Sequence, residues 1–221
     1  MTDSGLAAVL FDMDGTLIDT EKVWEVAIRE LARRYGGTLS DRARAAMLGT
    51  SSEETMRLLL ADLNQPWRDP DEGAEWINRR VEELFAEGVE WRPGARELLH
   101  AVRVAGLPTA LVTNTGRSLV DIALRTLGPE NFDVVVCGDE VDHAKPHPGH
   151  YLAAARALGV DPTRCVAIED SPTGVASATA AGCAVLAIPH ETPLGEVSGL
   201  VLASLHDADV ATLRNLVGAV A

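Results

Sequence analysis

Cysteine and aromatic residues are scarce in this chain of 221 residues, and each shortage excludes one way of building a stable fold. The three cysteines (Cys137, Cys165 and Cys183) are an odd number in apolar surroundings, which argues against a disulfide framework. We therefore expect buried thiols in a reducing compartment. Because aromatic residues make up 4% of the chain and hydrophobic residues 47%, the core must consist mainly of aliphatic side chains and alanine.

Positive charge is also scarce. The chain has 19 lysines and arginines against 33 aspartates and glutamates, which gives a formal net charge of −14. Nucleic acids and anionic membranes both require a basic surface, so we expect neither as a partner. The same net charge would repel a phosphorylated substrate at long range. A phosphate site in this chain must therefore gather its own cations.

Repeats, low-complexity segments and long apolar runs are absent as well. No apolar run reaches the length that spans a membrane, and the first residues lack the basic stretch and cleavage site of a signal peptide. We therefore expect a cytoplasmic protein, present as a monomer or a weak homodimer. The length suits one main domain with a smaller insert.

The clearest pattern lies at residues 6–16, where an unbroken apolar run ends in Asp12, Asp14, Gly15 and Thr16. A short, fully apolar run followed by turn residues is typical of a buried parallel strand. Ligands of open α/β sheets gather at the carboxyl ends of such strands. Two carboxylates this close stay ionised only beside a cation or hydrogen-bond donors, and oxygen ligands suit Mg²⁺.

Two other interpretations of this stretch were considered. An EF-hand loop also begins Asp-x-Asp, but it needs glycine at its sixth position and glutamate at its twelfth, where this chain has Leu17 and Val23. Simple helix capping by Asp12, with Asp14 shaping a turn, stays open at this point.

The rest of the chain divides into two kinds of pattern. Residues 20–90 show only helical periodicity, with helices expected at 21–35, after Ser40, from a capping box at Ser51 and Glu54, and from Asp69–Pro70 to about residue 88. From residue 91, strands alternate with helices. The strands are expected at 107–112, 133–137, 164–168, 184–188 and 200–202, and the helices at 93–104, 117–127, 148–158, 172–181 and 208–219.

This alternation predicts an α/β fold: a Rossmann-like parallel sheet with helices on both faces. The first strand belongs to a sheet that resumes about residue 91, so residues 1–19 and 91–221 form the core domain. Residues 20–90 are then an inserted helical cap domain over the carboxyl end of the first strand. Hinges are expected at residues 19–21 and 88–93.

Further polar groups follow three of the later strands. Thr113 and Asn114 end the second strand, where the Thr113 hydroxyl could donate to a phosphoryl oxygen, while Thr115 is expected to cap the next helix. Lys145 stands in a proline-bounded loop before a helix, where a cation suggests an anion that it must meet; the alternative is a solvated surface lysine.

Paired acids recur at Glu169 and Asp170, again after an apolar strand, and Asp170 or Ser171 could also cap the following helix. Paired acids at two strand ends of one sheet can share a metal ion. His147, next to two prolines, is expected to make a local loop contact. The six histidines show no zinc-type spacing.

Together, these four motifs resemble those of the haloacid dehalogenase (HAD) superfamily, in order and over essentially the whole chain. The resemblance implies a nucleophilic Asp12, which forms an aspartyl-phosphate, and Asp14 as general acid and base. It also implies Mg²⁺ bound by the Asp12 carboxylate, the Asp14 carbonyl and the last acid pair, with Glu169 ligating or orienting and Asp170 ligating. The implied phosphate-binding residues are Gly15, Thr16, Thr113, Asn114 and Lys145.

The helical insert resembles that of the C1-capped subgroup, which includes sugar phosphatases and β-phosphoglucomutase. Glu21 and Trp24 resemble the cap entry of hexose and hexitol phosphatases; with Thr50 and Ser52 they are the expected substrate-selecting residues, although Trp24 could equally be cap core. β-Phosphoglucomutases carry a histidine in place of Trp24 and an arginine in place of Ser52.

The expected activity is therefore Mg²⁺-dependent hydrolysis of small phosphorylated metabolites, above all sugar phosphates. A phosphosugar mutase is the second hypothesis, and a non-catalytic regulator that binds sugar phosphates is the third. Dehalogenation is disfavoured, because it leaves no alcohol for Asp14 to protonate.

Overall fold

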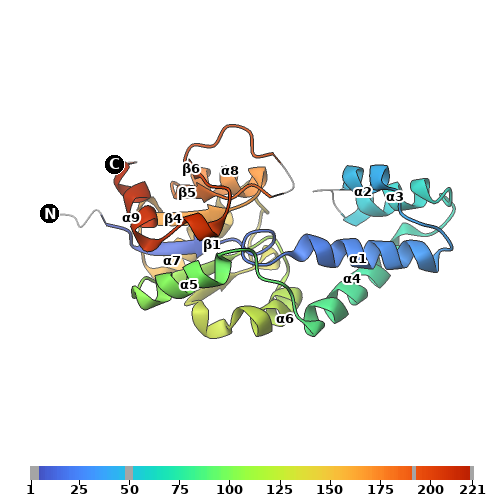
Figure 1. The fold of residues 1–221 in the computed structure, drawn as a ribbon, viewed down its shortest axis with the longest axis horizontal. Coiled ribbons are helices and arrows are strands. Elements are labelled where there is room, and N and C mark those ends of the chain that lie inside the picture. Colours follow the sequence, from blue (N-terminus) through green and yellow to red (C-terminus); the bar gives the residue numbers. More distant parts are fainter. Residues whose placement is uncertain (1–4, 48–51, 191–192, 220–221) are drawn as a thin grey trace. The chain divides into compact units, whose positions relative to one another are not determined.

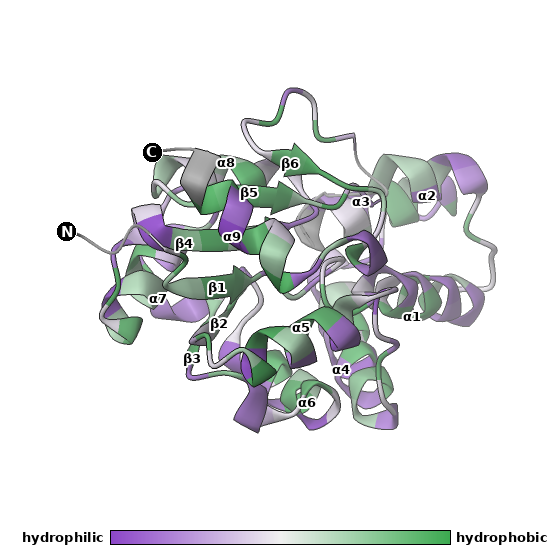
Figure 2. Cartoon of the chain, turned by 60° about the vertical axis from the view of Figure 1, so that its left-hand side comes forward, coloured by the Kyte–Doolittle hydropathy of each residue, from purple (hydrophilic) through white to green (hydrophobic). Residues whose placement is uncertain are grey.

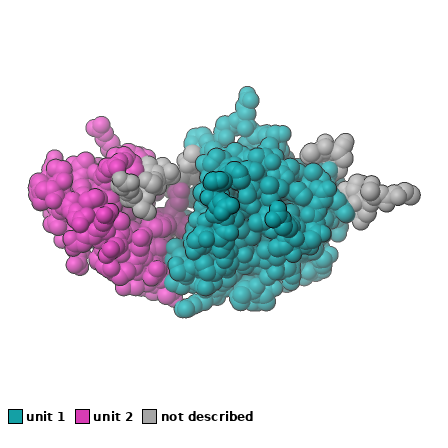
Figure 3. All heavy atoms as spheres, turned by 180° about the vertical axis from the view of Figure 1, so that it is seen from behind, with its two compact units in different colours: residues 1–19, 90–221 teal, residues 20–89 magenta. Residues whose placement is uncertain are grey.

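The computed structural model describes residues 5–47, 52–190 and 193–219, and the chain divides into two compact units. Unit 1 comprises residues 1–19 and 90–221, and unit 2 comprises residues 20–89 (Figure 3). The chain leaves unit 1 after Asp19 and returns to it at Glu90. This second boundary lies one residue before the expected one.

Unit 1 is built on a parallel sheet of six strands in the order β3-β2-β1-β4-β5-β6 (Figures 1 and 2). In the part of the chain that the structure describes, five helices of unit 1 accompany it, so the predicted α/β class is confirmed. The strands are β1 (Ala8–Phe11), β2 (Thr109–Val112), β3 (Val134–Val136), β4 (Cys165–Glu169), β5 (Ala184–Ala187) and β6 (Leu200–Val201). The helices are α5 (Ala95–Val104), α6 (Arg117–Leu127), α7 (Gly149–Leu158), α8 (Pro172–Ala180) and α9 (Val210–Ala219).

The strand order reverses between β1 and β4, and this reversal decides where a ligand can bind. Phe11 of β1 lies beside Leu111 of β2 on one side and Ile168 of β4 on the other. In open α/β sheets the crevice outside the carboxyl ends of the strands, at such a reversal, is the usual binding site. Asp12 and Glu169 stand at this edge.

The core of unit 1 consists mainly of aliphatic side chains and alanine, as predicted, with Phe11 and Tyr151 as its largest buried side chains. Every residue of β1, β2, β4 and β5 is buried. Figure 2 shows these strands as mainly hydrophobic, and the helices around them as amphipathic. Helices α7 and α8 pack with Ala8 and Leu10, and α9 lies across β4 and β5 with α5 beside it. All three cysteines are buried free thiols.

Unit 2 consists of α1 (Thr20–Arg34), α2 (Asp41–Met47), α3 (Ser52–Asp62) and α4 (Pro70–Glu87). Helix α4 begins as predicted, because the Asp69 carboxylate accepts a hydrogen bond from the backbone of Asp71 and Pro70 is its first residue. The Arg80 Nε of α4 donates to Glu30 of α1 at 2.7 Å. The expected capping box at Ser51 lies outside the described residues.

Predicted and observed element bounds differ where a backbone N–H that was expected in the sheet bonds elsewhere. The strand expected from residue 107 begins at Thr109, because the Leu107 N–H bonds to Val102 and closes the end of α5, while Pro108 has no N–H. Four single-turn 3₁₀ helices were not predicted, since one turn leaves no periodic pattern: η1 (Pro129–Asn131), η2 (Gly138–Glu140), η3 (Pro162–Arg164) and η4 (Leu205–Asp207). Among the described residues, no helix has both the length and the apolar character needed to cross a bilayer.

Gly94, which precedes α5, offers a direct test of the packing between α5 and η4. It has φ +81°, and a Cβ there would lie 2.2 Å from the backbone nitrogen of His206. Gly106 has φ +72° with open space around its Cα, which makes it a matched control. We expect Gly106→Ala to lower the free energy of unfolding by about 1–2 kcal/mol, through left-handed strain alone.

Gly94→Ala should lower the free energy of unfolding by a further amount of about 1–3 kcal/mol, because the added methyl group overpacks against backbone. Urea denaturation of both variants measures the difference. Equal losses in the two variants would contradict the close approach of α5 and η4.

Candidate functional site

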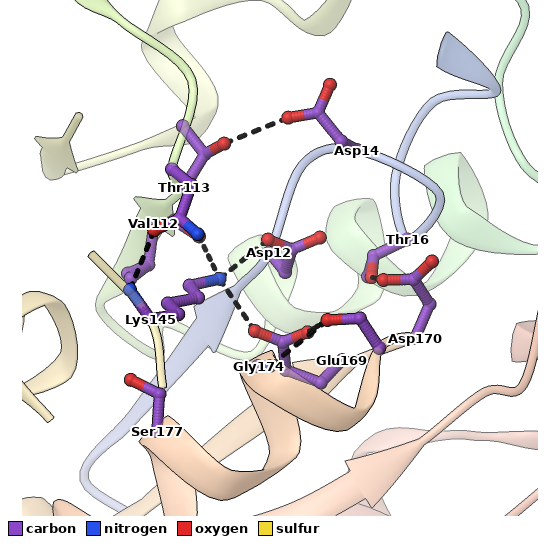
Figure 4. Close-up of polar contacts among 12 residues, drawn as sticks. Asp12, Asp14, Thr16, Val112, Thr113, Lys145, Glu169, Asp170, Gly174 and Ser177 are labelled. Atoms are coloured by element: carbon purple, nitrogen blue, oxygen red, sulfur yellow. Dashed lines mark hydrogen bonds and ion pairs between the residues drawn. The ribbon is translucent and has the colours of Figure 1, made fainter. Parts of the chain in front are cut away.

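Three carboxylates from two neighbouring strand ends converge at the carboxyl edge of the sheet (Figure 4). Asp12 follows β1 directly, and its N–H donates to the Ile168 carbonyl at 3.0 Å, which prolongs the ladder between β1 and β4. Glu169 is the last residue of β4, and Asp170 follows it. One oxygen from each of the three lies within 4.8 Å of the other two.

Lys145 is the cation among these acids. Its side chain is 3% exposed, and Nζ donates to Asp12 Oδ1 at 2.7 Å, to Glu169 Oε1 at 2.6 Å and to the Val112 carbonyl at 3.0 Å (Figure 4). An ammonium group has three protons, so these three contacts use all of them. The interpretation of Lys145 as a solvated surface lysine is therefore wrong.

Two residues from different elements hold this lysine in place. The Lys145 backbone N–H donates to Asn114 Oδ1 at 2.9 Å, which ties the lysine loop to the end of β2. Tyr151 of α7 donates its hydroxyl to Glu169 Oε1 at 2.6 Å, and its ring centroid lies 5.1 Å from Lys145 Nζ. Tyr151 was missed by the sequence analysis, although a tyrosine in an alanine-rich helix signals a buried hydroxyl that needs a partner.

The electrostatics of the cluster follow from burial. Burial raises the pKa of Asp12 well above its usual value, and the Glu169 charge adds to this, while Lys145 opposes it. Burial, then Glu169 and Asp14, raise the pKa of Asp170 to about 7. Burial opposes the charged form of Lys145, but Asp12 and Glu169 outweigh it and raise its pKa. One buried cation thus faces three carboxylates, which leaves negative charge uncompensated.

The cluster suits a divalent cation. Asp12 Oδ2 is buried and has no hydrogen-bond partner among the described residues, a costly arrangement for a carboxylate oxygen. A cluster of carboxylate oxygens, together with a buried oxygen that lacks a donor, suits Mg²⁺, which binds hard oxygen ligands. Gly15 (φ +79°) permits the close approach of Asp170, since a Cβ at Gly15 would lie 2.1 Å from Asp170 Oδ2.

Asp14 points to the end of β2, away from this cluster (Figure 4). Its Oδ2 accepts hydrogen bonds from the hydroxyls of Thr113 at 2.9 Å and Thr115 at 2.8 Å. The prediction that Thr115 caps α6 is wrong: Gly116 occupies the capping position. Thr16, also expected near phosphate, donates to Asp170 at 3.4 Å.

The remaining predicted contacts have mixed outcomes. Ser171 caps α8 through a hydrogen bond from Gly174, as expected, and His147 accepts from the Gly149 N–H within its own loop, as expected. Glu21 and Trp24 lie in the first turns of α1 in unit 2, and both are half-buried. Thr50 and the side chain of Ser52 lie outside the described residues. Substrate contacts by these four residues stay predictions.

His150 of α7 is a further buried polar residue near the cluster. It is completely buried, and neither ring nitrogen has a hydrogen-bond partner among the described residues. Burial, assisted by the nearby Lys145 charge, lowers the pKa of His150 to about 4. The ring is therefore neutral in the folded protein at pH 7, whereas in the unfolded chain it titrates near its ordinary pKa of about 6.5.

Between about pH 6.5 and 4 the unfolded chain binds a proton at His150 that the folded protein does not. Because this proton uptake favours the unfolded chain, the wild type loses stability as the pH falls through this window. We expect His150→Leu to remove that loss, so the variant should gain stability relative to the wild type. The slope of the difference is at most about 1.4 kcal/mol per pH unit. Urea denaturation of both proteins at several pH values measures it, and a pH-independent difference would contradict the assigned burial of His150.

Comparison with known proteins agrees with this geometry. A family model for haloacid dehalogenase-like hydrolases matches residues 6–182. Hexitol phosphatase A of Escherichia coli is 36% identical over 210 residues, which cover 93% of this chain and 94% of that protein. A phosphorylated carbohydrates phosphatase of Thermotoga maritima is 35% identical over 182 residues, covering 80% and 82% of the two chains.

Among solved structures, a mutant of CbbY from Rhodobacter sphaeroides in complex with xylulose-(1,5)-bisphosphate superposes with a TM-score of 0.76. It is 28% identical, and the match covers 95% of this chain and 99% of that one.

Proposed function

This chain belongs to the haloacid dehalogenase-like hydrolases and is a phosphoric monoester hydrolase, and we propose that it dephosphorylates sugar phosphates with Mg²⁺ through an aspartyl-phosphate on Asp12. The observation that carries the proposal is the state of Asp12. Lys145 holds one oxygen of this buried carboxylate, and the other oxygen has no hydrogen-bond partner among the described residues. Such a carboxylate is fixed in direction and has one oxygen available to attack phosphorus.

The reaction then has two steps. An Asp12 oxygen forms a bond to phosphorus, the bond from phosphorus to the sugar oxygen breaks, and Asp14 gives its proton to that leaving oxygen. In the second step Asp14 takes a proton from water as the water oxygen attacks phosphorus. The bond between phosphorus and Asp12 breaks, which releases phosphate and restores the Asp12 carboxylate and the protonated Asp14.

Asp12 and Asp170 would hold Mg²⁺ through carboxylate oxygens, with the Asp14 carbonyl as a further ligand and Glu169 ligating or orienting. When bound, the ion neutralises the acids and the charge that develops on the transferring phosphoryl group. Thr113 would donate to a phosphoryl oxygen. Because the protons of Lys145 are already engaged, this lysine would act on the phosphoryl group chiefly through its charge.

Sugar phosphates are the proposed substrate class. The names of two relatives, hexitol phosphatase A and a phosphorylated carbohydrates phosphatase, support it. Unit 2 would act as the cap that selects the sugar, with Glu21 and Trp24 of α1 among the selecting residues. A cytoplasmic location agrees with the buried free thiols and belongs to the same proposal.

The proposal is tested by phosphate release from a panel of hexose, hexitol, pentose and glycolate phosphates and nucleotides. The wild type should prefer one sugar phosphate class and lose turnover when a chelator removes Mg²⁺. Asp12→Asn should lower the rate of phosphate release by at least about 10³-fold, because the nucleophile is lost, while its circular dichroism spectrum shows that the variant is folded.

Two results would contradict the proposal. Conversion of glucose 1-phosphate to glucose 6-phosphate without phosphate release would identify a phosphosugar mutase. Undiminished turnover by Asp12→Asn would exclude Asp12 as the nucleophile.

A further inference from the structure

Asp14 is held by two hydroxyl groups that come from the same short segment. The Thr113 hydroxyl and the Thr115 hydroxyl both donate to Asp14 Oδ2, at 2.9 Å and 2.8 Å. The Thr115 backbone N–H also donates to Thr113 Oγ1 at 3.0 Å. Thr115 therefore contacts Asp14 directly through its side chain and indirectly through its backbone.

The two hydroxyl groups differ in whether a bound substrate would compete with Asp14 for their proton. A hydroxyl group has a single proton to donate. If Thr113 turns that proton toward a phosphoryl oxygen, as the proposed function requires, Asp14 loses one of its two donors. The proposed function does not require the Thr115 hydroxyl to donate to the phosphoryl group, so this hydroxyl can keep its hydrogen bond to Asp14.

Thr115 also does not cap α6, although its position just before this helix predicts that it would. A threonine just before a helix usually caps it with its side chain. Here the first N–H of α6, that of Arg117, donates to Asp139 Oδ1 at 3.0 Å, so the cap is supplied from η2. The Thr115 hydroxyl is consequently available for Asp14.

We propose that Thr115 is a positioning residue for Asp14: it orients the carboxyl group that protonates the leaving oxygen, independently of whether Thr113 binds phosphate. This inference rests on the proposed function. A carboxyl group held at Oδ2 presents its other oxygen in one direction, which is what proton transfer to a departing alcohol requires.

Leaving groups of different basicity provide the test. A sugar alkoxide must be protonated as it leaves, whereas p-nitrophenolate is stable without a proton. The ratio kcat/KM reports the steps up to leaving-group departure. We expect Thr115→Val to lower kcat/KM for the preferred hexitol phosphate by about 10- to 100-fold, part of the 10²- to 10⁴-fold typical of general acid catalysis. For p-nitrophenyl phosphate the loss should stay below about threefold.

Thr115→Ser keeps the hydroxyl and should restore most of the activity on the hexitol phosphate. Thr126→Val, near the far end of α6, is the matched control for loss of a threonine hydroxyl and should change neither substrate's kcat/KM. Equal losses by Thr115→Val on both substrates, or failure of Thr115→Ser to rescue, would overturn the inference while leaving the proposed function intact. A wild type that releases phosphate from neither substrate would overturn both.

Discussion

The ion pairs of Lys145 are the interaction on which the rest of the site depends. A single buried ammonium group joins Asp12 after β1, Glu169 at the end of β4 and the carbonyl of Val112 in β2. Breaking a buried ion pair by removing one partner typically costs about 3–5 kcal/mol, because the other charge is left uncompensated. The sheet order β2-β1-β4 brings these partners within reach of one side chain.

The hydrogen-bond donors of the site are almost fully used by its own acids. Lys145 has no spare proton, Tyr151 donates to Glu169, and Thr113 and Thr115 donate to Asp14. Among the acceptors, Asp12 Oδ2 has no hydrogen-bond partner in the part of the chain that the structure describes. A site in which most acids are held and one oxygen has no donor agrees with the proposed nucleophilic attack and cation binding better than with passive binding of an anion.

The sequence allowed prediction of the fold class and the residues at the strand ends, because apolar runs followed by polar residues are local patterns. It could not give the direction of each side chain. Thr115 was expected to cap α6, but Asp139, 24 residues away along the chain, supplies that bond. Tyr151 and His150 lie in a helix whose sequence is typical of ordinary core. Only the tertiary packing shows that the Tyr151 hydroxyl contacts Glu169 and that the His150 imidazole has no hydrogen-bond partner among the described residues.

The proposed mechanism requires that Asp12 carries the phosphoryl group during turnover. The most direct measurement is an acid quench of the enzyme turning over a hexitol phosphate with Mg²⁺, followed by peptide mass spectrometry. The account predicts phosphate on the peptide that contains Asp12, and none on that peptide from Asp12→Asn. Phosphate on another carboxylate, or turnover with no phosphorylated peptide under conditions where chemistry precedes the slow step, would contradict this assignment.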